Sequence, residues 1–311
     1  MEFERPDIIR PPSEHDSYFL PVTSGCSNNV CTFCGAYYAH KLRMRELDDV
    51  KKEIDAMALY LHHGVRLTGV DDLVYMLLSK WDEKKVFLQD GDALVYPVSK
   101  LKESLEYLNS KFPDLERTGA YATPQDILRR SVDELVALKK HKLNIIYMGV
   151  ESGDDEVLKN VCKGATHDQM VEAGRKVKQA GIILSVTVIL GLAGLEGSEK
   201  HAIETARALS EMDPEYAGAL TLMLVPETPL HNDYVEGKFK LISPFDTLKE
   251  LRLMIERSDF TDCFFSSVHA SNYFNLKGRL PHEKARLLRE LEAILAKQDP
   301  KLLRPEFLRG L

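Results

Sequence analysis

Gly25-Cys26-Ser27-Asn28-Asn29-Val30-Cys31-Thr32-Phe33-Cys34 carries three of the five cysteines of this chain within one short stretch. It follows directly on a strand-like run, Tyr18 to Val22, and its Ser-Asn-Asn segment is turn-forming. Three thiolates on one loop indicate a metal site. Because a cubane iron–sulfur cluster needs four ligands, a loop with three cysteines would leave one iron open for chemistry.

A zinc site is the alternative interpretation of the same cysteines. His40 would be the fourth ligand of a Cys3His site. Zinc knots usually bring two paired hooks, and no second hook follows in this sequence. The spacing therefore favours the iron–sulfur cluster.

Composition limits the class of protein. The 311 residues, 44% hydrophobic and 29% charged, are typical of a soluble globular protein of single-barrel size. No apolar run is long enough for a membrane span and the first residues lack a signal peptide, so we expect a cytoplasmic protein without a membrane partner, in keeping with an oxygen-sensitive cluster. The net charge of −7 argues against a nucleic-acid partner. Cys162 and Cys263 are too few for a second cluster, and we expect both to be buried.

The rest of the chain alternates strands with helices. Capping patterns such as Ser131-Val132-Asp133-Glu134 start the helices. The apolar run Ile182–Leu190 is typical of a parallel strand covered on both faces. The expected strands are Tyr18–Val22, Val86–Leu88, Arg117–Tyr121, Asn144–Val150, Ile182–Leu190 and Tyr216–Leu224. This order predicts a parallel α/β architecture, either an open barrel or a doubly wound sheet, although the first turn lacks the G-x-G-x-x-G of dinucleotide folds.

The two ends of the chain depart from this rhythm. Residues 1–16 are rich in proline and charge, and we expect an N-terminal arm. From His231 onward we expect a helix from Pro244 to Ser258, a strand at Cys263–Val268 and a last helix from Pro281 to Lys297. The predicted organisation is an arm at 1–16, an α/β domain at 17–230 and a C-terminal helical extension at 231–311 packed on it.

A cysteine triplet that ends in Cys-x-aromatic-Cys, just after the first strand of a βα repeat, resembles the radical S-adenosylmethionine (radical SAM) enzymes. Here the motif is CX4CX2C, with four residues between Cys26 and Cys31 where the common pattern has three. The resemblance implies a partial (β/α)6 TIM-type barrel of parallel strands. It also implies that Cys26, Cys31 and Cys34 hold a [4Fe–4S] cluster that works on S-adenosylmethionine (SAM).

Polar residues that end the second strand extend the resemblance. Gln89-Asp90-Gly91-Asp92 is similar to the family segment, often Gly-Gly-Glu, that binds the amino group of SAM, which assigns Asp90, Gly91 and Asp92 to the cofactor. An acidic surface turn would have the same composition. Tyr121, at the end of the third strand, could face the cofactor.

The fourth strand ends in Gly149-Val150-Glu151-Ser152-Gly153, followed by Lys163-Gly164. This combination resembles the branch that includes the oxygen-independent coproporphyrinogen oxidases and the methylthiotransferases. The corresponding position in that branch contacts the ribose of SAM, which suggests Glu151, with Ser152 beside it. Lys163 would meet the carboxylate of SAM, although an exposed helix-end lysine is about as common.

The remaining cofactor residues are apolar. Phe33, between the last two cysteines, corresponds to the usual adenine-side residue of the family. Leu190 ends the fifth strand in Leu190-Gly191-Leu192-Ala193-Gly194, which resembles the family's strand beside the adenine. Val225 precedes Pro226-Glu227-Thr228-Pro229, which is similar to a Pro-Gly-Thr segment that often follows the sixth strand.

The loop Val268 to Tyr273 is the candidate substrate site. A six-stranded barrel is laterally open, so a strand at Cys263–Val268 could close it and carry His269, Asn272 and Tyr273 to its mouth. We expect His269 and Asn272 to orient the substrate, and Tyr273 could quench or relay a radical. A polar connection before the last helix would explain the same residues.

The function that the resemblance implies is reductive cleavage of SAM to a 5′-deoxyadenosyl radical, which abstracts hydrogen from a small-molecule substrate. Its partners would be that substrate and an electron donor such as flavodoxin or ferredoxin. The alternatives are a cluster- or haem-binding carrier on the same barrel without turnover, and a radical methyltransferase or porphyrin-modifying enzyme.

Overall fold

A computed structural model gives the fold of the chain and describes residue 3 and residues 5–310. The chain forms two compact units. The first consists of residues 1–29, 39–147 and 176–183, and the second of residues 30–38, 148–175 and 184–311. Residues 1, 2 and 4 of the expected N-terminal arm lie outside the described part, and within the remainder of the arm Pro12–Glu14 forms a short 3-10 helix.

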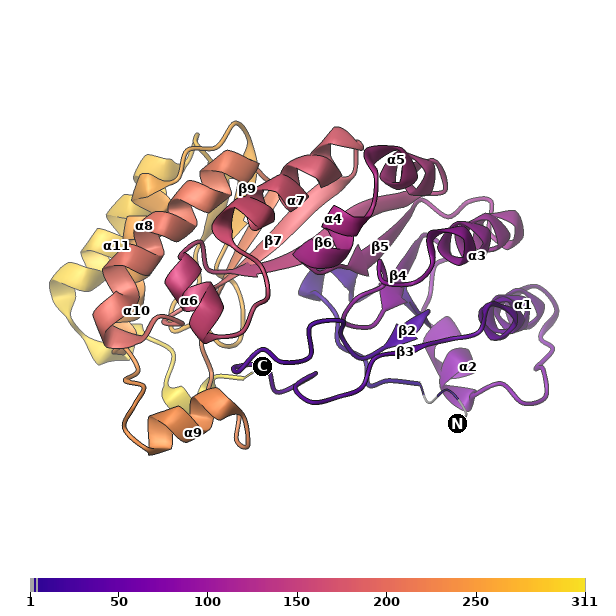
Figure 1. Cartoon of the computed structure of the whole chain (residues 1–311), viewed down its shortest axis with the longest axis horizontal. Helices are drawn as coiled ribbons and strands as arrows, with labels where there is room; N and C mark the ends of the chain where they lie inside the picture. The colour runs from indigo at the N-terminus through magenta and orange to yellow at the C-terminus, as the bar shows by residue number, and fades with distance from the viewer. Residues whose placement is uncertain (1–2, 4, 311) are drawn as a thin grey trace. The chain divides into compact units, whose positions relative to one another are not determined.

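The first unit contains a parallel sheet whose strands follow the order β1-β4-β5-β6 (Figure 1). β1 (Tyr18–Pro21) pairs with β4 (Lys85–Gln89), β4 with β5 (Arg117–Tyr121), and β5 with the first half of β6 (Leu143–Glu151). The helices of this unit are α1 (Leu47–His63), α2 (Asp72–Leu78), α3 (Val98–Lys111), α4 (Pro124–Arg129) and α5 (Val132–Lys140). A short antiparallel ribbon, β2 (Thr23–Ser24) with β3 (Arg43–Met44), brackets the segment that holds the cysteines.

The core of the first unit lies along the strands. Phe19, Phe87, Ile145 and Tyr147 form a buried cluster, and Tyr121 packs against it. The N-terminal 3-10 helix places Glu14 in this interior, where its carboxylate accepts hydrogen bonds from Ser17, from Tyr147 and from Arg117, the last at 2.7 Å. A buried carboxylate needs such donors, so these contacts explain how the arm is fixed to the sheet.

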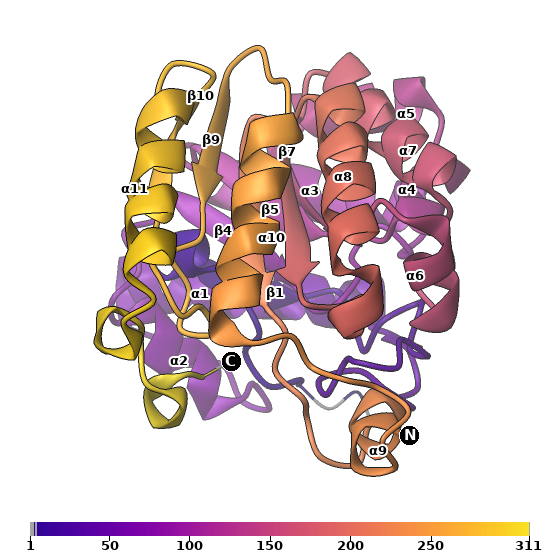
Figure 2. The same cartoon turned by 90° about the vertical axis from the view of Figure 1, so that its left-hand side faces the viewer.

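The second unit continues the strand–helix alternation. β7 (Ile183–Leu190) pairs in parallel with β8 (Tyr216–Thr221), and β8 with β9 (Cys263–Ser266). β10 (Lys277–Leu280) is antiparallel to β9. Its helices are α6 (Asp155–Asn160), α8 (Gly194–Met212), α9 (Pro229–Val235), α10 (Pro244–Arg257) and α11 (Lys284–Lys297), and α7 (His167–Gln179) runs from this unit into the first. Figure 2 shows α10 between α8 and α11, and it packs against both.

Most elements confirm the sequence prediction, but several differ. β9 ends at Ser266 instead of Val268, and α11 begins at Lys284 instead of Pro281. β7 is not covered on both faces: Leu184, Val186, Val188 and Leu190 are buried, whereas the alternate residues are only half-buried. β8 ends at Thr221 instead of Leu224, because the chain turns toward Pro226. The sequence also gave no expectation of β10, whose Lys277 and Arg279 are exposed.

Over residue 3 and residues 5–310, no helix is both long and apolar enough to cross a bilayer.

Candidate functional site

The cysteine segment begins in the first unit at Gly25. Its backbone has φ of +88°, and a Cβ at this position would lie 3.1 Å from the Lys41 carbonyl oxygen, so glycine is required. The Gly25 amide donates to Asp90 Oδ2 at 2.8 Å. This contact ties the start of the segment to the end of β4, directly before half-buried Cys26.

The other two cysteines belong to the second unit. Cys31 is buried and Cys34 half-buried, and the Cys34 amide donates to the Cys31 carbonyl at 3.2 Å. Between them, Thr32 is held on both sides, because its amide donates to Val161 O and its carbonyl accepts from the Leu230 amide, each at 3.0 Å. The turn that carries Cys31 and Cys34 is therefore held by backbone contacts on both sides.

None of the three cysteines of the motif forms a disulfide. Three thiolates are the donor set for three irons of a cubane cluster, so the residues present fit that group. In the described part of the chain, no three His, Cys, Asp or Glu side chains are gathered as metal ligands. The fit therefore rests on the donor chemistry of the segment.

Cys162 corrects a sequence prediction. It was expected to be buried, but it is exposed in the turn after α6, with φ of +54°. Its carbonyl oxygen lies 3.8 Å from the Cys31 sulfur. Cys263, in β9, is buried as expected.

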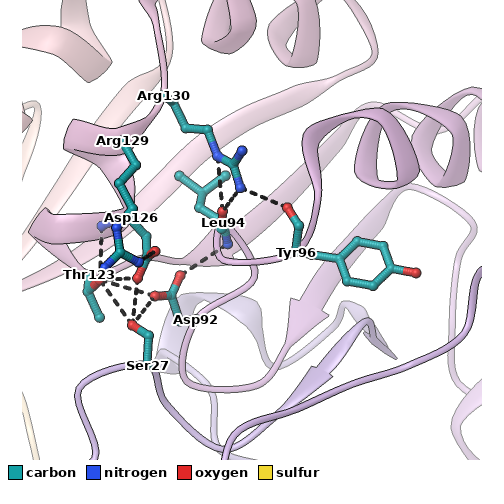
Figure 3. Close-up of polar contacts among 8 residues, drawn as sticks. All are labelled: Ser27, Asp92, Leu94, Tyr96, Thr123, Asp126, Arg129 and Arg130. Atoms are coloured by element: carbon teal, nitrogen blue, oxygen red, sulfur yellow. Dashed lines mark hydrogen bonds and ion pairs between the residues drawn. The ribbon is translucent and has the colours of Figure 1, made fainter.

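Asp92 lies at the centre of a hydrogen-bond network in the first unit (Figure 3). Its Oδ2 accepts from the hydroxyls of Ser27 at 2.6 Å and Thr123 at 3.1 Å, and its Oδ1 accepts from the Leu94 amide at 3.1 Å. The same two hydroxyls contact Asp126 Oδ2, at 2.6 and 2.8 Å. Two carboxyl groups from different strand ends thus share their hydroxyl partners next to Cys26.

The pKa values of Asp92 and Asp126 are shifted in opposite directions. Asp92 is fully buried, and its pKa is raised well above the usual range. The larger cause is burial, and the second is the neighbouring carboxyl of Asp126. Burial also pushes the pKa of Asp126 upward, but hydrogen bonds from Asp92 and the two hydroxyls, together with Arg129, outweigh it and hold that pKa below its usual value. Arg129 donates to Asp126 Oδ1 at 2.6 Å. A proton bound to Asp92 and donated to ionised Asp126 accounts for both directions.

Tyr121 and Asp90 complete the predicted set of the first unit. Tyr121 is half-buried, and its ring packs edge-on against Phe87, with the centroids 5.1 Å apart. Asp90 is buried and accepts from Gly25, as described above. Gly91 lies between these two aspartates, in the loop that follows β4.

In the second unit, Glu151 and Lys163 contact each other. The Lys163 ammonium donates to Glu151 Oε1 at 2.8 Å. Both side chains are nearly buried, and they lie over Gly149, where a Cβ would come within 2.1 Å of the same Glu151 oxygen. Glycine at 149 therefore makes room for the pair at the end of β6.

The predicted adenine-side residues also lie in the second unit. Phe33 packs against a buried cluster that includes Val161, Leu192 and Leu230. The Leu190 side chain is buried, so only its backbone could meet a ligand. Val225 lies against Gly35, where a Cβ would be 2.4 Å from Val225 Cγ1. Ser152 is buried, and its hydroxyl lies 2.8 Å from Nδ1 of His201.

The structure shows how the predicted substrate loop is held. Asn272 is buried, and its amide donates to the carbonyls of Ala219 at 2.8 Å and Ser267 at 2.5 Å. The Tyr273 hydroxyl is hydrogen-bonded by Arg309 and donates to Glu306 at 2.8 Å. His269 is half-buried, and its Nδ1 lies 2.9 Å from Ser271 Oγ.

Four residues of these networks had no functional assignment from sequence. Ser27 belongs to the turn-forming segment and directly follows Cys26, and no motif in the sequence points to Asp126. His201 and Glu250 lie inside helical patterns, with no signal of their contacts.

Comparisons with known proteins agree on one family. The model of the Radical SAM superfamily matches residues 20–206. The chain is 22% identical over 174 residues to the putative methylthiotransferase MJ0865 of Methanocaldococcus jannaschii, covering 55% of this chain and 34% of that protein. It is 21% identical over 218 residues to the heme chaperone HemW of Bacillus subtilis, covering 68% of this chain and 52% of that protein.

A solved structure has the same fold. Coproporphyrinogen III oxidase (HemN) from Escherichia coli superposes with a TM-score of 0.53 at 17% identity, covering 77% of this chain and 51% of that one. The likeness confirms the predicted α/β fold of the partial-barrel class. The chain spans about a third to a half of the length of the curated relatives described above.

Proposed function

Because this chain belongs to the radical SAM superfamily, we propose that it binds a [4Fe–4S] cluster through Cys26, Cys31 and Cys34 and cleaves SAM. Family membership confirms the predicted kind of cofactors and of enzyme, and it favours the cluster over the alternative of a zinc site with His40. The observation that carries the proposal is the set of three cysteines outside any disulfide, on the segment that follows β1 and β2, in a chain of this family.

When bound, the cluster supplies the electron that cleaves SAM to methionine and a 5′-deoxyadenosyl radical, which takes a hydrogen atom from the substrate. The protein's contribution is to hold SAM and substrate together and to exclude water.

The first unit would bind the methionine end of SAM. Asp92 and Asp126 share one proton between buried carboxyls, and an ammonium group can take the place of that proton. Asp90 fixes the start of the cysteine segment through Gly25, and Gly91 would lie beside the amino group of SAM in the loop between the two aspartates. Tyr121 would present its exposed edge to the cofactor.

The second unit would bind the adenosine part of SAM and also the carboxylate of its methionine part. Glu151 would accept from the ribose hydroxyls, and Lys163, now paired with it, would turn to the carboxylate of SAM. Phe33, the backbone of Leu190 and Val225 would line the adenine, with Ser152 supporting the turn after β6.

For the substrate, we propose His269 as the residue that orients it. Asn272 and Tyr273 would support the loop, because their polar atoms bind Ala219, Ser267, Glu306 and Arg309. The electron would come from a donor such as flavodoxin or ferredoxin. We propose a small molecule as substrate, and no nucleic acid, on the ground of the net charge of −7.

Anaerobic reconstitution tests this proposal. The protein should take up about four irons and four sulfides per chain, and dithionite with SAM should yield 5′-deoxyadenosine. The triple variant Cys26→Ala, Cys31→Ala, Cys34→Ala should take up no cluster. Stoichiometric zinc without iron in the wild-type protein would overturn the proposal.

A second candidate is a haem-binding carrier on the same fold, favoured by the likeness to HemW over 68% of this chain. A reconstituted protein that binds haemin stoichiometrically and yields no 5′-deoxyadenosine would support the carrier over the enzyme.

A further inference from the structure

A buried polar network in the second unit joins the ends of β6 and β7 to α8 and α10. His201 comes from α8 and Glu250 from α10, two helices that lie side by side (Figure 2). Both side chains are fully buried. Buried ionisable groups are costly unless their partners are well placed.

His201 connects the two strand ends. Its Nε2 lies 3.1 Å from the Ile189 carbonyl oxygen, so Nε2 carries the hydrogen and Nδ1 accepts from the Ser152 hydroxyl at 2.8 Å. Ser152 Oγ in turn accepts from the Asp154 amide at 3.0 Å. Each atom has its partner with a neutral ring, in agreement with burial lowering the pKa of His201 to about 4.

Glu250 holds the turn that follows β7. Its Oε1 accepts from the Gly191 amide at 2.6 Å, and its Oε2 accepts from the Ser198 hydroxyl. Gly191 has φ of +81°, and a Cβ there would lie 3.3 Å from Ile242. The Leu195 amide donates to Lys240 O at 2.9 Å. Residues 240–250 of the C-terminal extension therefore fix the turn at 191–195.

Serine, histidine and glutamate are also the residues of an acyl-transfer triad. Here Ser152 and His201 are fully buried, and His201 Nε2 is 3.6 Å from Glu250 Oε1 while it donates to Ile189. No substrate can reach a serine so placed. The network can act only through the backbone that it holds.

We propose that Glu250 and His201 are positioning residues for the adenosine part of SAM. They fix the turns after β6 and β7, which carry Glu151 and Gly191, so that helix α10 of the extension sets the affinity for the nucleoside. The inference rests on the proposed function, because it assumes that these two turns meet SAM.

The test uses anaerobically reconstituted holoprotein and calorimetry with two probes, 5′-methylthioadenosine for the nucleoside end and methionine for the other. Glu250→Leu removes the acceptor of the Gly191 amide and should weaken 5′-methylthioadenosine binding about tenfold, the equivalent of one hydrogen bond to a charged group. Methionine affinity should not change. Glu250→Gln keeps an acceptor for Gly191 and a donor for Ser198, and should restore the affinity.

Glu256→Leu is the matched control, because Glu256 lies on the same helix but contacts only Arg252 across an exposed surface. It should bind both probes like the wild-type protein. If Glu250→Leu does not fold, Ser198→Ala, which deletes one donor to Glu250, takes its place and should weaken 5′-methylthioadenosine binding about threefold.

The outcomes separate the two claims. Wild-type affinity for 5′-methylthioadenosine in Glu250→Leu, or in its substitute Ser198→Ala, would overturn the positioning role and leave the proposed function intact. Equal losses for both probes would also overturn it, since a general loosening does not distinguish the two ends of SAM. A wild-type holoprotein that binds neither SAM nor 5′-methylthioadenosine would overturn the proposed function itself.

Discussion

Asp92 in the first unit follows β4, and Glu250 in the second lies on α10 against the turn that follows β7. Both carboxyls are buried, yet their surroundings differ. Asp92 faces two hydroxyls and a second carboxyl, Asp126. The two carboxyls together can carry more negative charge than the neighbouring hydroxyls neutralise. Glu250 has an amide and a hydroxyl as donors and a neutral histidine nearby. The first arrangement is suited to a cation, and the second is complete by itself.

The comparison shows why a raised pKa alone does not identify a binding residue. Burial raises the pKa of both groups. Only at Asp92 does a second carboxyl add to the effect. We therefore assign the ligand to the carboxyl pair and a positioning role to the single carboxyl.

The largest effect is expected from Asp92→Asn. Loss of the charge should weaken methionine and SAM binding about 100-fold, the cost of removing one partner of a buried charge pair. An asparagine oxygen at the Oδ1 position can still accept from the Leu94 amide, and the asparagine NH2 group at the Oδ2 position can donate to the Ser27 hydroxyl, so the melting temperature should not fall. Calorimetry with methionine and 5′-methylthioadenosine measures the split. If this variant loses as much affinity for 5′-methylthioadenosine as for methionine, Asp92 does not act on the methionine part alone, and it does not differ from Glu250 as we propose.

The second effect concerns stability against pH at Glu250. Burial raises its pKa from 4.5 to about 7 in the folded protein, so the stabilisation is fully present below pH 4.5 and is lost as the pH rises through 7. Between pH 5.5 and 8 the wild-type free energy of unfolding should fall by about 2 kcal/mol relative to Glu250→Gln. Urea denaturation of both proteins at the two pH values measures this difference. Parallel pH curves would show that Glu250 does not titrate in this range.

These carboxyls also show what sequence could and could not provide. β5 has the bounds that its sequence predicts, Arg117–Tyr121, because short buried strands have a local signal. Asp92 was assigned from its place after a strand, in a segment similar to a family motif. Glu250 meets Gly191 across 59 residues of sequence, and His201 meets Ser152 across 49. No periodicity reports such contacts, so these residues look like ordinary helix positions until the fold is known.

Cys162 and β10 failed for a similar reason. A cysteine is most often buried, but the turn after α6 gives Cys162 a positive φ and turns it to solvent. β10 is short, with exposed Lys277 and Arg279, and forms only because β9 offers an edge for pairing. Both depend on neighbours that are distant in sequence.

A third, smaller effect should appear in the pH dependence of methionine binding. The pKa of Asp92 is raised, so as the pH falls through that value the carboxyl pair holds a proton that an ammonium must displace. As the pH increases, methionine affinity should therefore rise by about tenfold per pH unit until the pH reaches the pKa of the pair, and it should stay constant above that pKa. In Asp126→Asn the partner that raises this pKa is gone, and the rise should move to lower pH. Calorimetry from pH 5 to 9 tests this shift. If the dependence of methionine affinity on pH is the same in Asp126→Asn as in the wild-type protein, Asp126 is not part of the methionine site.

The smallest effects are expected from the two serines that donate to these carboxyls, Ser27 and Ser198. Each Ser→Ala change removes one hydrogen bond to a carboxyl whose pKa is raised, and a hydrogen bond of this kind is worth about 1 kcal/mol. Asp92 would keep its bonds from Thr123 and the Leu94 amide, whereas Glu250 would keep only the Gly191 amide. Ser198→Ala should therefore raise the pKa of Glu250 further, and move its pH-dependent loss of stability to higher pH. Ser27→Ala should leave that profile unchanged and weaken methionine binding by no more than threefold.

Thermal melts across the pH range, with and without methionine, compare the two serine variants. Equal changes in the pH dependence of the melting temperature in both variants would mean that the two carboxyls are held in the same way. The distinction between a ligand-binding carboxyl, Asp92, and a positioning carboxyl, Glu250, would then be wrong.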